Sequence, residues 1–207
     1  MLKDRLRTGV YLPGDRLDAN HIGKEFSVSH TPVREALGKL SSEVLVEAHI
    51  HKGYFVPRVS EKGLRDLYEW HLHLLLLALQ LILNSGLSSW REWSLLTHAD
   101  SKATALTEAL FMDIGLCSGN PEITRAIANV NDRLHWIRAN KGPLLTDQAE
   151  EIEGLIAKWR TEDLEGLRDS LITYHRRRQF LAEDIIALMH RCEMTSRLMI
   201  DMGRRTN

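Results

Sequence analysis

The stretch that most constrains this chain is "SVSHTPVREALGKL", residues 27–40. Its apolar residues recur at the i, i+3, i+4, i+7 spacing of one buried helix face: Val33, Ala36, Leu37 and Leu40. Thr31 is a favourable N-cap, and Pro32 loses nothing at the first helical position, where no N–H is needed. The pattern therefore predicts a helix that begins at Pro32, with Arg34 in its first turn and off the buried face.

The flanking residues complete a small domain. "YLPGDRL" predicts a turn, and a helix is expected to follow it with Asp18 as its N-cap. Beyond residue 40, two short strands are expected at about Val46–His49 and Tyr54–Val56. The order helix, helix, turn, helix, hairpin is typical of a winged helix-turn-helix.

Arg34 is the first candidate binding residue. In helix-turn-helix proteins the N-terminal part of the second helix meets the base edges, and a guanidinium there can bond bidentately to a guanine. A single arginine is more often a solvated surface residue, but the cap, turn, apolar face and wing around it favour DNA contact. Residues 1–59 also carry 9 Lys and Arg against 7 Asp and Glu, a small positive excess.

Residues 60–207 are expected to form a separate all-helical domain, because "VPRVSEKG" joins a proline, a polar break and a new N-cap, Ser60. The apolar run "WHLHLLLLALQLIL" (Trp70–Leu83) has 14 residues, which predicts a mostly buried helix and no membrane span. The N-terminus does not have a signal-peptide pattern, and two cysteines suggest a reducing compartment, so we expect a cytoplasmic protein.

At "GVYLPGDRL", "FSVSHTPVREALGKL" and "HKGYFV", the chain resembles the GntR family of bacterial transcription regulators. The remainder, including "SGNPEI", is similar to the helical FCD sensor domain of the FadR subfamily. The resemblance implies a mainly α fold: a winged helix-turn-helix over 1–59, and an all-helical effector-binding and dimerisation domain over 60–207. It also implies a homodimeric repressor that binds a pseudo-palindromic operator in double-stranded DNA and responds to a small-molecule effector.

Carried over by position, the resemblance implies these DNA-contacting residues: Ser29, His30, Thr31, Arg34, Lys52 and Gly53. The family usually has arginine where His30 stands. Histidine donates hydrogen bonds without a permanent charge, so we expect weaker binding or an altered site preference.

Many members of the family bind a divalent metal through one Asp and three His. Counting from Ser118, the matching positions fall at or near Thr107, Phe111, Ile152 and His175, and His175 alone is a suitable ligand. One imidazole does not hold a metal, so we expect no metal and no cofactor.

An organic acid or acyl metabolite is expected as effector instead, with three candidate contacts: His71, Arg133 and His175. Arg133 belongs to a stripe that faces either an acidic effector or water. "YHRRRQF" (Tyr174–Phe180) is a basic helix turn with the same two interpretations, a solvated face or an anion contact.

The alternative function is a helical metal-binding protein or enzyme with a vestigial helix-turn-helix. Ten histidines invite it, but His71 and His73 lie on different helix faces, and His98 with Asp100 is a weak metal pair. The sequence has no Ser-His-Asp elbow, phosphate-binding glycine loop or CxxC, so we expect no catalysis.

Overall fold

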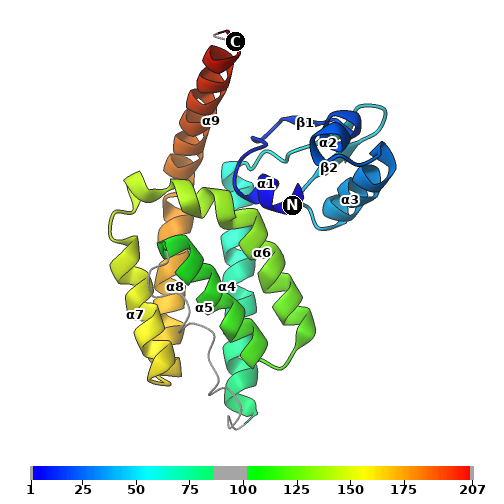
Figure 1. Cartoon of the computed structure of the whole chain (residues 1–207). Helices are drawn as coiled ribbons and strands as arrows, with labels where there is room; N and C mark the ends of the chain where they lie inside the picture. The colour runs from blue at the N-terminus through cyan, green and yellow to red at the C-terminus, as the bar shows by residue number, and fades with distance from the viewer. Residues whose placement is uncertain (1, 86–101, 206–207) are drawn as a thin grey trace. The chain divides into compact units, whose positions relative to one another are not determined.

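The computed structural model describes residues 2–85 and 102–205 (Figure 1). Its contacts divide the chain into two units, residues 1–59 with 190–207, and residues 60–189. The first unit is thus made of two stretches of the chain, one that ends at Val59 and one that begins at His190. In the described part of the chain, no helix is long and apolar enough to cross a membrane. His98 and Asp100 lie outside the described residues.

The first unit is an α/β domain with these elements: α1 Leu2–Arg7, β1 Arg16–Leu17, α2 Ala19–Phe26, α3 His30–Ser42, β2 Glu47–His49 and β3 Gly53–Phe55. Within the described residues the strands form one antiparallel sheet in the order β1-β3-β2. The predicted hairpin is confirmed to within a residue. The sequence analysis did not predict β1. A strand of two residues is too short to show an alternation of apolar and polar residues, and β1 is defined by its pairing with β3.

The turn between α2 and α3 depends on close backbone packing. Asp18 caps α2 as predicted, since its carboxylate accepts from the N–H groups of Asn20 and His21. The helix ends where Ser27 adopts φ 56°, and the Val28 N–H donates to the Gly23 carbonyl at 2.9 Å. A Cβ at Gly23 would lie 2.8 Å from the Val28 oxygen, so this turn needs glycine there.

The predicted start of α3 is wrong by two residues. The helix begins at His30 with Ser29 as N-cap, not at Pro32 with Thr31 as N-cap. Pro32 is the third helical residue. It is tolerated because the N–H groups of the whole first turn have no intrahelical acceptor.

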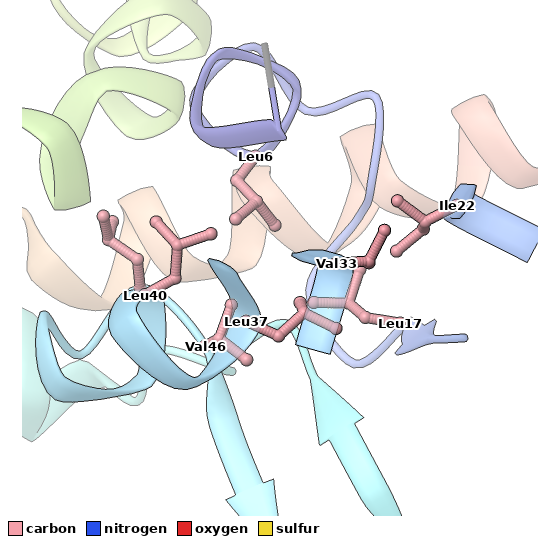
Figure 2. Close-up of a cluster of buried hydrophobic side chains, with 8 residues drawn as sticks. Leu6, Leu17, Ile22, Val33, Leu37, Leu40 and Val46 are labelled. Atoms are coloured by element: carbon pink, nitrogen blue, oxygen red, sulfur yellow. The ribbon is translucent and has the colours of Figure 1, made fainter. Parts of the chain in front are cut away.

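The core of the first unit confirms the predicted apolar face of α3. Val33, Leu37 and Leu40 are buried, and Ala36 is partly buried. Figure 2 shows Val33, Leu37 and Leu40 with side chains from α1, β1, α2 and the segment just before β2. The complete cluster is Leu6, Leu17, Ile22, Val33, Leu37, Leu40, Leu45 and Val46. Burying three side chains on one face fixes the rotation of α3, so its other faces remain exposed.

The second unit is helical, as predicted, and its elements are α4 Glu61–Asn84, α5 Ala103–Cys117, α6 Pro121–Asn140, the 3₁₀ turn η2 Gly142–Leu144, α7 Gln148–Arg160 and α8 Leu164–Phe180. Helix α9, Ala182–Arg205, begins here and ends among residues of the first unit. Helix α4 packs against α5, α6 and α8, while α7 packs against α5 and α8 (Figure 1). Ser60 caps α4 as predicted, accepting from the Gly63 N–H.

Candidate nucleic-acid interface and helical-domain core

The N-terminal end of α3 presents polar side chains on its exposed side. The predicted DNA-contacting residues are all exposed: Ser29, His30, Thr31, Arg34, Lys52 and Gly53. Arg34 follows the buried Val33 directly and therefore lies about 100° round the helix from it. Among the described residues, no hydrogen bond or ion pair is assigned to Arg34. The described residues therefore leave the five N–H donors of its guanidinium open to an acceptor such as DNA.

The hairpin turn between β2 and β3 is tight. The Lys52 N–H donates to the His49 carbonyl at 3.1 Å, and His51 and Gly53 have φ of 61° and 95°. A glycine is favoured at φ 95°, which few L side chains adopt. The turn therefore holds the exposed Lys52 at the tip of the wing.

Arg16 is an exposed cation at the wing that the sequence analysis missed. Arg16 lies in β1, where it pairs with Phe55 of β3. Its Nε lies 3.8 Å from the position that a Cβ atom on Gly53 would occupy. A guanidinium beside Lys52 strengthens the positive potential at the wing. No local sequence signal could identify Arg16, because its position depends on the pairing of β1.

His71 of α4 and His175 of α8, two of the predicted effector contacts, are brought together. Both are 0% exposed, and His71 Nδ1 lies 3.0 Å from His175 Nε2. His175 Nδ1 donates to the Leu171 carbonyl at 2.7 Å. We therefore assign His175 Nε2 as an acceptor and His71 Nδ1 as its donor, which leaves His71 Nε2 as an acceptor when the ring is neutral.

Burial keeps both histidines neutral. It lowers the pKa of His175 to about 3, even though its hydrogen bond to Leu171 favours the charged form. The pKa of His71 falls well below its usual value, first through burial and then through the positive charges nearby. The third predicted contact, Arg133, is half-buried on α6, and burial lowers its pKa.

The three arginines in the basic turn at the end of α8 differ in burial and in their partners. Arg176 is exposed, and Arg177 forms a two-bond ion pair with Asp147 at 2.7 and 2.8 Å. Arg178 is 1% exposed and pairs with Glu151 of α7. Neither interpretation of the turn foresaw an arginine in the core, because the sequence does not show which face of α8 is covered.

The comparisons with known proteins agree with this geometry. Residues 1–56 match the family model described as bacterial regulatory proteins, gntR family. The Nta operon transcriptional regulator of Aminobacter aminovorans is 29% identical over 167 residues, which cover 74% of this chain and 78% of that protein. The gluconate operon transcriptional repressor of Bacillus subtilis is 38% identical over 71 residues, 34% of this chain and 29% of the repressor.

Residues 1–56 are therefore similar to the bacterial gntR-family regulators, and the two relatives named above are described as transcriptional regulators. Solved structures show the same fold. E. coli McbR/YncC has a TM-score of 0.62 at 23% identity, covering 88% of this chain and 93% of its own. A protein of Rhodococcus sp. RHA1 described as a GntR transcriptional regulator has a TM-score of 0.66 at 18% identity, covering 88% and 94%. The relatives named here are described as transcriptional regulators, which favours a regulator over the catalytic alternative.

In this chain, the side chains at three of the four positions singled out from the sequence are not the Asp and His ligands of the family's metal site. Thr107 donates its hydroxyl to the Ala103 carbonyl at 2.7 Å, and Ile152 is 1% exposed. The Phe111 ring packs edge-on against His71, with centroids 4.9 Å apart. Among residues 2–85 and 102–205, no cluster of three His, Cys, Asp or Glu side chains is suited to a metal ion.

Proposed function

We propose that this regulator is a repressor of the FadR subfamily that binds a pseudo-palindromic operator as a homodimer. A small-molecule effector, an organic acid or acyl metabolite, binds in its helical domain and retunes DNA binding. The protein needs no metal or other cofactor for this response. The proposal also places it in the cytoplasm, where its DNA is.

One observation carries the DNA-binding part. The buried face of α3 orients the helix so that Ser29, His30, Thr31 and Arg34 project from its exposed N-terminal end. A recognition helix uses this end in the major groove, while a wing cation contacts the phosphate backbone. Arg34 is therefore assigned to a base edge and Lys52 to a phosphate.

A dimer is supported by large apolar side chains on α4 that are exposed among the described residues. Trp70 is 53% exposed and Leu77 46%, and seven residues apart they lie on the same side of the helix. A second copy with the same stripe would bury both. A two-fold dimer also places two recognition helices about one DNA turn apart, as a pseudo-palindrome requires.

The experiment starts from a pool of random duplexes, from which the full-length protein selects its preferred site. Titration of that site at several salt concentrations should give a linear fall of log K with log salt, because phosphate contacts release counterions. Sedimentation at micromolar concentration should show a dimer without DNA. A stable monomer that still binds the selected two-half-site duplex would overturn the dimer. If the selection enriches no sequence, specific DNA binding is overturned.

A further inference from the structure

The histidines of residues 1–59 are all exposed: His21, His30, His49 and His51. His30 is the first residue of α3, and His51 lies in the turn between β2 and β3. Among the described residues, no hydrogen bond or ion pair is assigned to the ring of either of these two. Both imidazoles are therefore open to a partner such as DNA.

His30 shares a helix face with Arg34, the proposed base contact. It precedes Arg34 by four residues, and side chains at this spacing lie on the same side of a helix. The other charged or titratable groups of α3, and of α2 and β2 packed against it, are His21, Lys24, Glu25, Arg34, Glu35, Lys39, Glu47 and His49. A duplex that meets Arg34 at this end of α3 therefore also brings its phosphates towards His30.

The carboxylates of α2 and α3 have another partner or lie on another side of the helix. Glu25 of α2 accepts from the Tyr11 hydroxyl at 2.8 Å. Glu35 follows His30 by five residues, which places it about 140° round α3. Neither carboxylate is ion-paired with His30, so DNA is the anion that this imidazole meets when the protein binds.

The wing turn holds His51 beside Lys52. His51 and Gly53 have φ of 61° and 95°, and the Lys52 N–H donates to the His49 carbonyl at 3.1 Å. The other charged or titratable groups of the three strands and this turn are Arg16, Glu47, His49, Lys52 and Tyr54. Glu47 is the single carboxylate among these groups, and its Oε2 lies 3.2 Å from His49 Nε2. His51 thus lies next to cations, at a tip that faces phosphate if the wing contacts DNA.

The chemistry of the imidazole ring makes such a contact depend on pH. Histidine is the side chain that ordinarily changes its charge between about pH 5 and 8. A neutral ring donates one hydrogen bond, whereas the protonated ring donates two and carries a full charge. Duplex DNA has one negative charge for about every 1.7 Å of its axis, and an anion within roughly 4–6 Å favours the charged ring. A histidine that contacts phosphate therefore takes up a proton as the DNA binds.

We propose that operator binding by this protein is linked to proton uptake at His30 and His51, so that the protein binds DNA more tightly as the pH falls from 7.5 to 6. The inference rests on the proposed DNA-binding function and adds a regulation of the same surface by pH. Arginine contacts do not change charge in this range, so they supply a part of the affinity that is independent of pH. Each proton taken up steepens the dependence of log K on pH by up to one unit.

The test is titration of the selected operator with the full-length protein at four pH values from 7.5 to 6, all at one ionic strength. We expect the association constant to rise about tenfold over this range, roughly threefold from each histidine. Calorimetry in two buffers with different ionisation enthalpies counts the protons exchanged and should show a net uptake. An association constant that stays within about twofold, or that falls in acid, would overturn the inference.

Variants assign the protons to residues. His30→Gln and His51→Gln cannot titrate, so each should remove about threefold of the change, and the double variant should bind with nearly constant affinity. His30→Arg carries a permanent charge and should bind more tightly than wild type at pH 7.5, with a smaller dependence on pH. His73→Gln, exposed on α4 in the second unit, is the matched control and should keep the full change.

Two results would assign the effect to other groups and overturn the inference. One is a double variant that keeps the full change, because His30 and His51 would then not be its source. The other is loss of the change in His49→Gln alone, which would assign it to the ion pair with Glu47. Circular dichroism at pH 6 confirms that each variant is folded. If one is not, the titrations and the proton count of the unaltered protein still decide whether binding takes up protons.

The same titrations distinguish this inference from the proposed function. If the protein selects no DNA sequence at any of these pH values, the proposed DNA-binding function is overturned, and the inference with it. Selective binding that does not depend on pH keeps the proposed function and overturns the inference alone. Protonation of buried His71 and His175 on unfolding weakens binding as the pH falls, so it has the opposite sign to the expected rise.

Discussion

The two domains use positively charged residues in opposite ways. In the first domain Arg16, Arg34 and Lys52 are exposed, and the apolar face of α3 carries the core without them. In the helical domain Arg138 and Arg178 are among the largest fully buried side chains. Exposed cations contribute little to folding and much to DNA affinity, whereas buried cations affect stability strongly when a partner is removed. Mutations in the two regions should therefore change different measured quantities.

The largest expected effect is acid unfolding of the helical domain. Burial keeps the pKa of His175 at about 3 and that of His71 well below its usual value, while both would take up protons near pH 6.5 once unfolded. The unfolded state then binds more protons below pH 6.5, so the free energy of unfolding decreases as the pH is lowered, by roughly 1.4 kcal/mol per pH unit for each histidine. All five tryptophans lie in residues 70–159, so their fluorescence reports on the helical domain.

The variant that isolates this effect is His71→Gln, which cannot titrate. It should lower the slope of unfolding free energy against pH by about 1.4 kcal/mol per unit between pH 6 and 4.5. His73→Gln, exposed on the same helix, is the control and should keep the wild-type slope. An unchanged slope in His71→Gln would show that His71 is protonated in the folded protein, and the contrast between the domains would lose its strongest support.

The second prediction concerns the buried ion pair. Glu151→Gln leaves the guanidinium of Arg178, 1% exposed, without a carboxylate, so the free energy of unfolding should fall by about 3 kcal/mol. The exposed neighbour Glu150→Gln is the matched control, expected to change stability by less than about 0.5 kcal/mol. Urea denaturation followed by tryptophan fluorescence measures both. Equal midpoints for the two variants would mean that Arg178 does not depend on Glu151.

How much the sequence could predict differs between the domains for a physical reason. In the first domain the helix-turn-helix depends on local signals, a cap at Asp18, apolar residues spaced by three and four, and a glycine in the wing. These signals lie within a few residues of the structure that they specify. The predicted start of α3 was still wrong. Thr31 and Pro32 fit the N-cap and first position of a helix, but the same two residues are also compatible with a helix that begins two residues earlier.

In the helical domain the informative contacts are long-range. His71 and His175 are 104 residues apart and were both singled out, but their hydrogen bond could not be foreseen. Arg138 and Arg178 look like ordinary surface arginines in sequence. Their burial depends on how five helices meet, and the 3.6-residue period does not fix that arrangement. Arg133 remains a prediction from the sequence.

The third prediction tests the exposed domain through DNA. Arg34→Ala should cost roughly 1–3 kcal/mol on the selected operator and much less on random duplex, because a bidentate base contact is lost. Stability should change little, since Arg34 is exposed. Arg168→Ala, exposed in the helical domain, is the control for removing one surface charge. Equal losses on both duplexes would make Arg34 a phosphate contact and not a base reader.

The smallest effect is expected at the wing. Lys52→Ala should weaken binding to operator and random duplex about equally and reduce the slope of log K against log salt by about one, the loss of a single phosphate contact. Arg16→Ala should behave in the same way if its guanidinium, beside Gly53, reaches the same stretch of backbone. The double variant then reduces the slope by about two, because independent phosphate contacts add. A double variant with the slope of either single variant would show that the two cations contact one phosphate together, and a loss confined to the operator would show that the wing reads sequence.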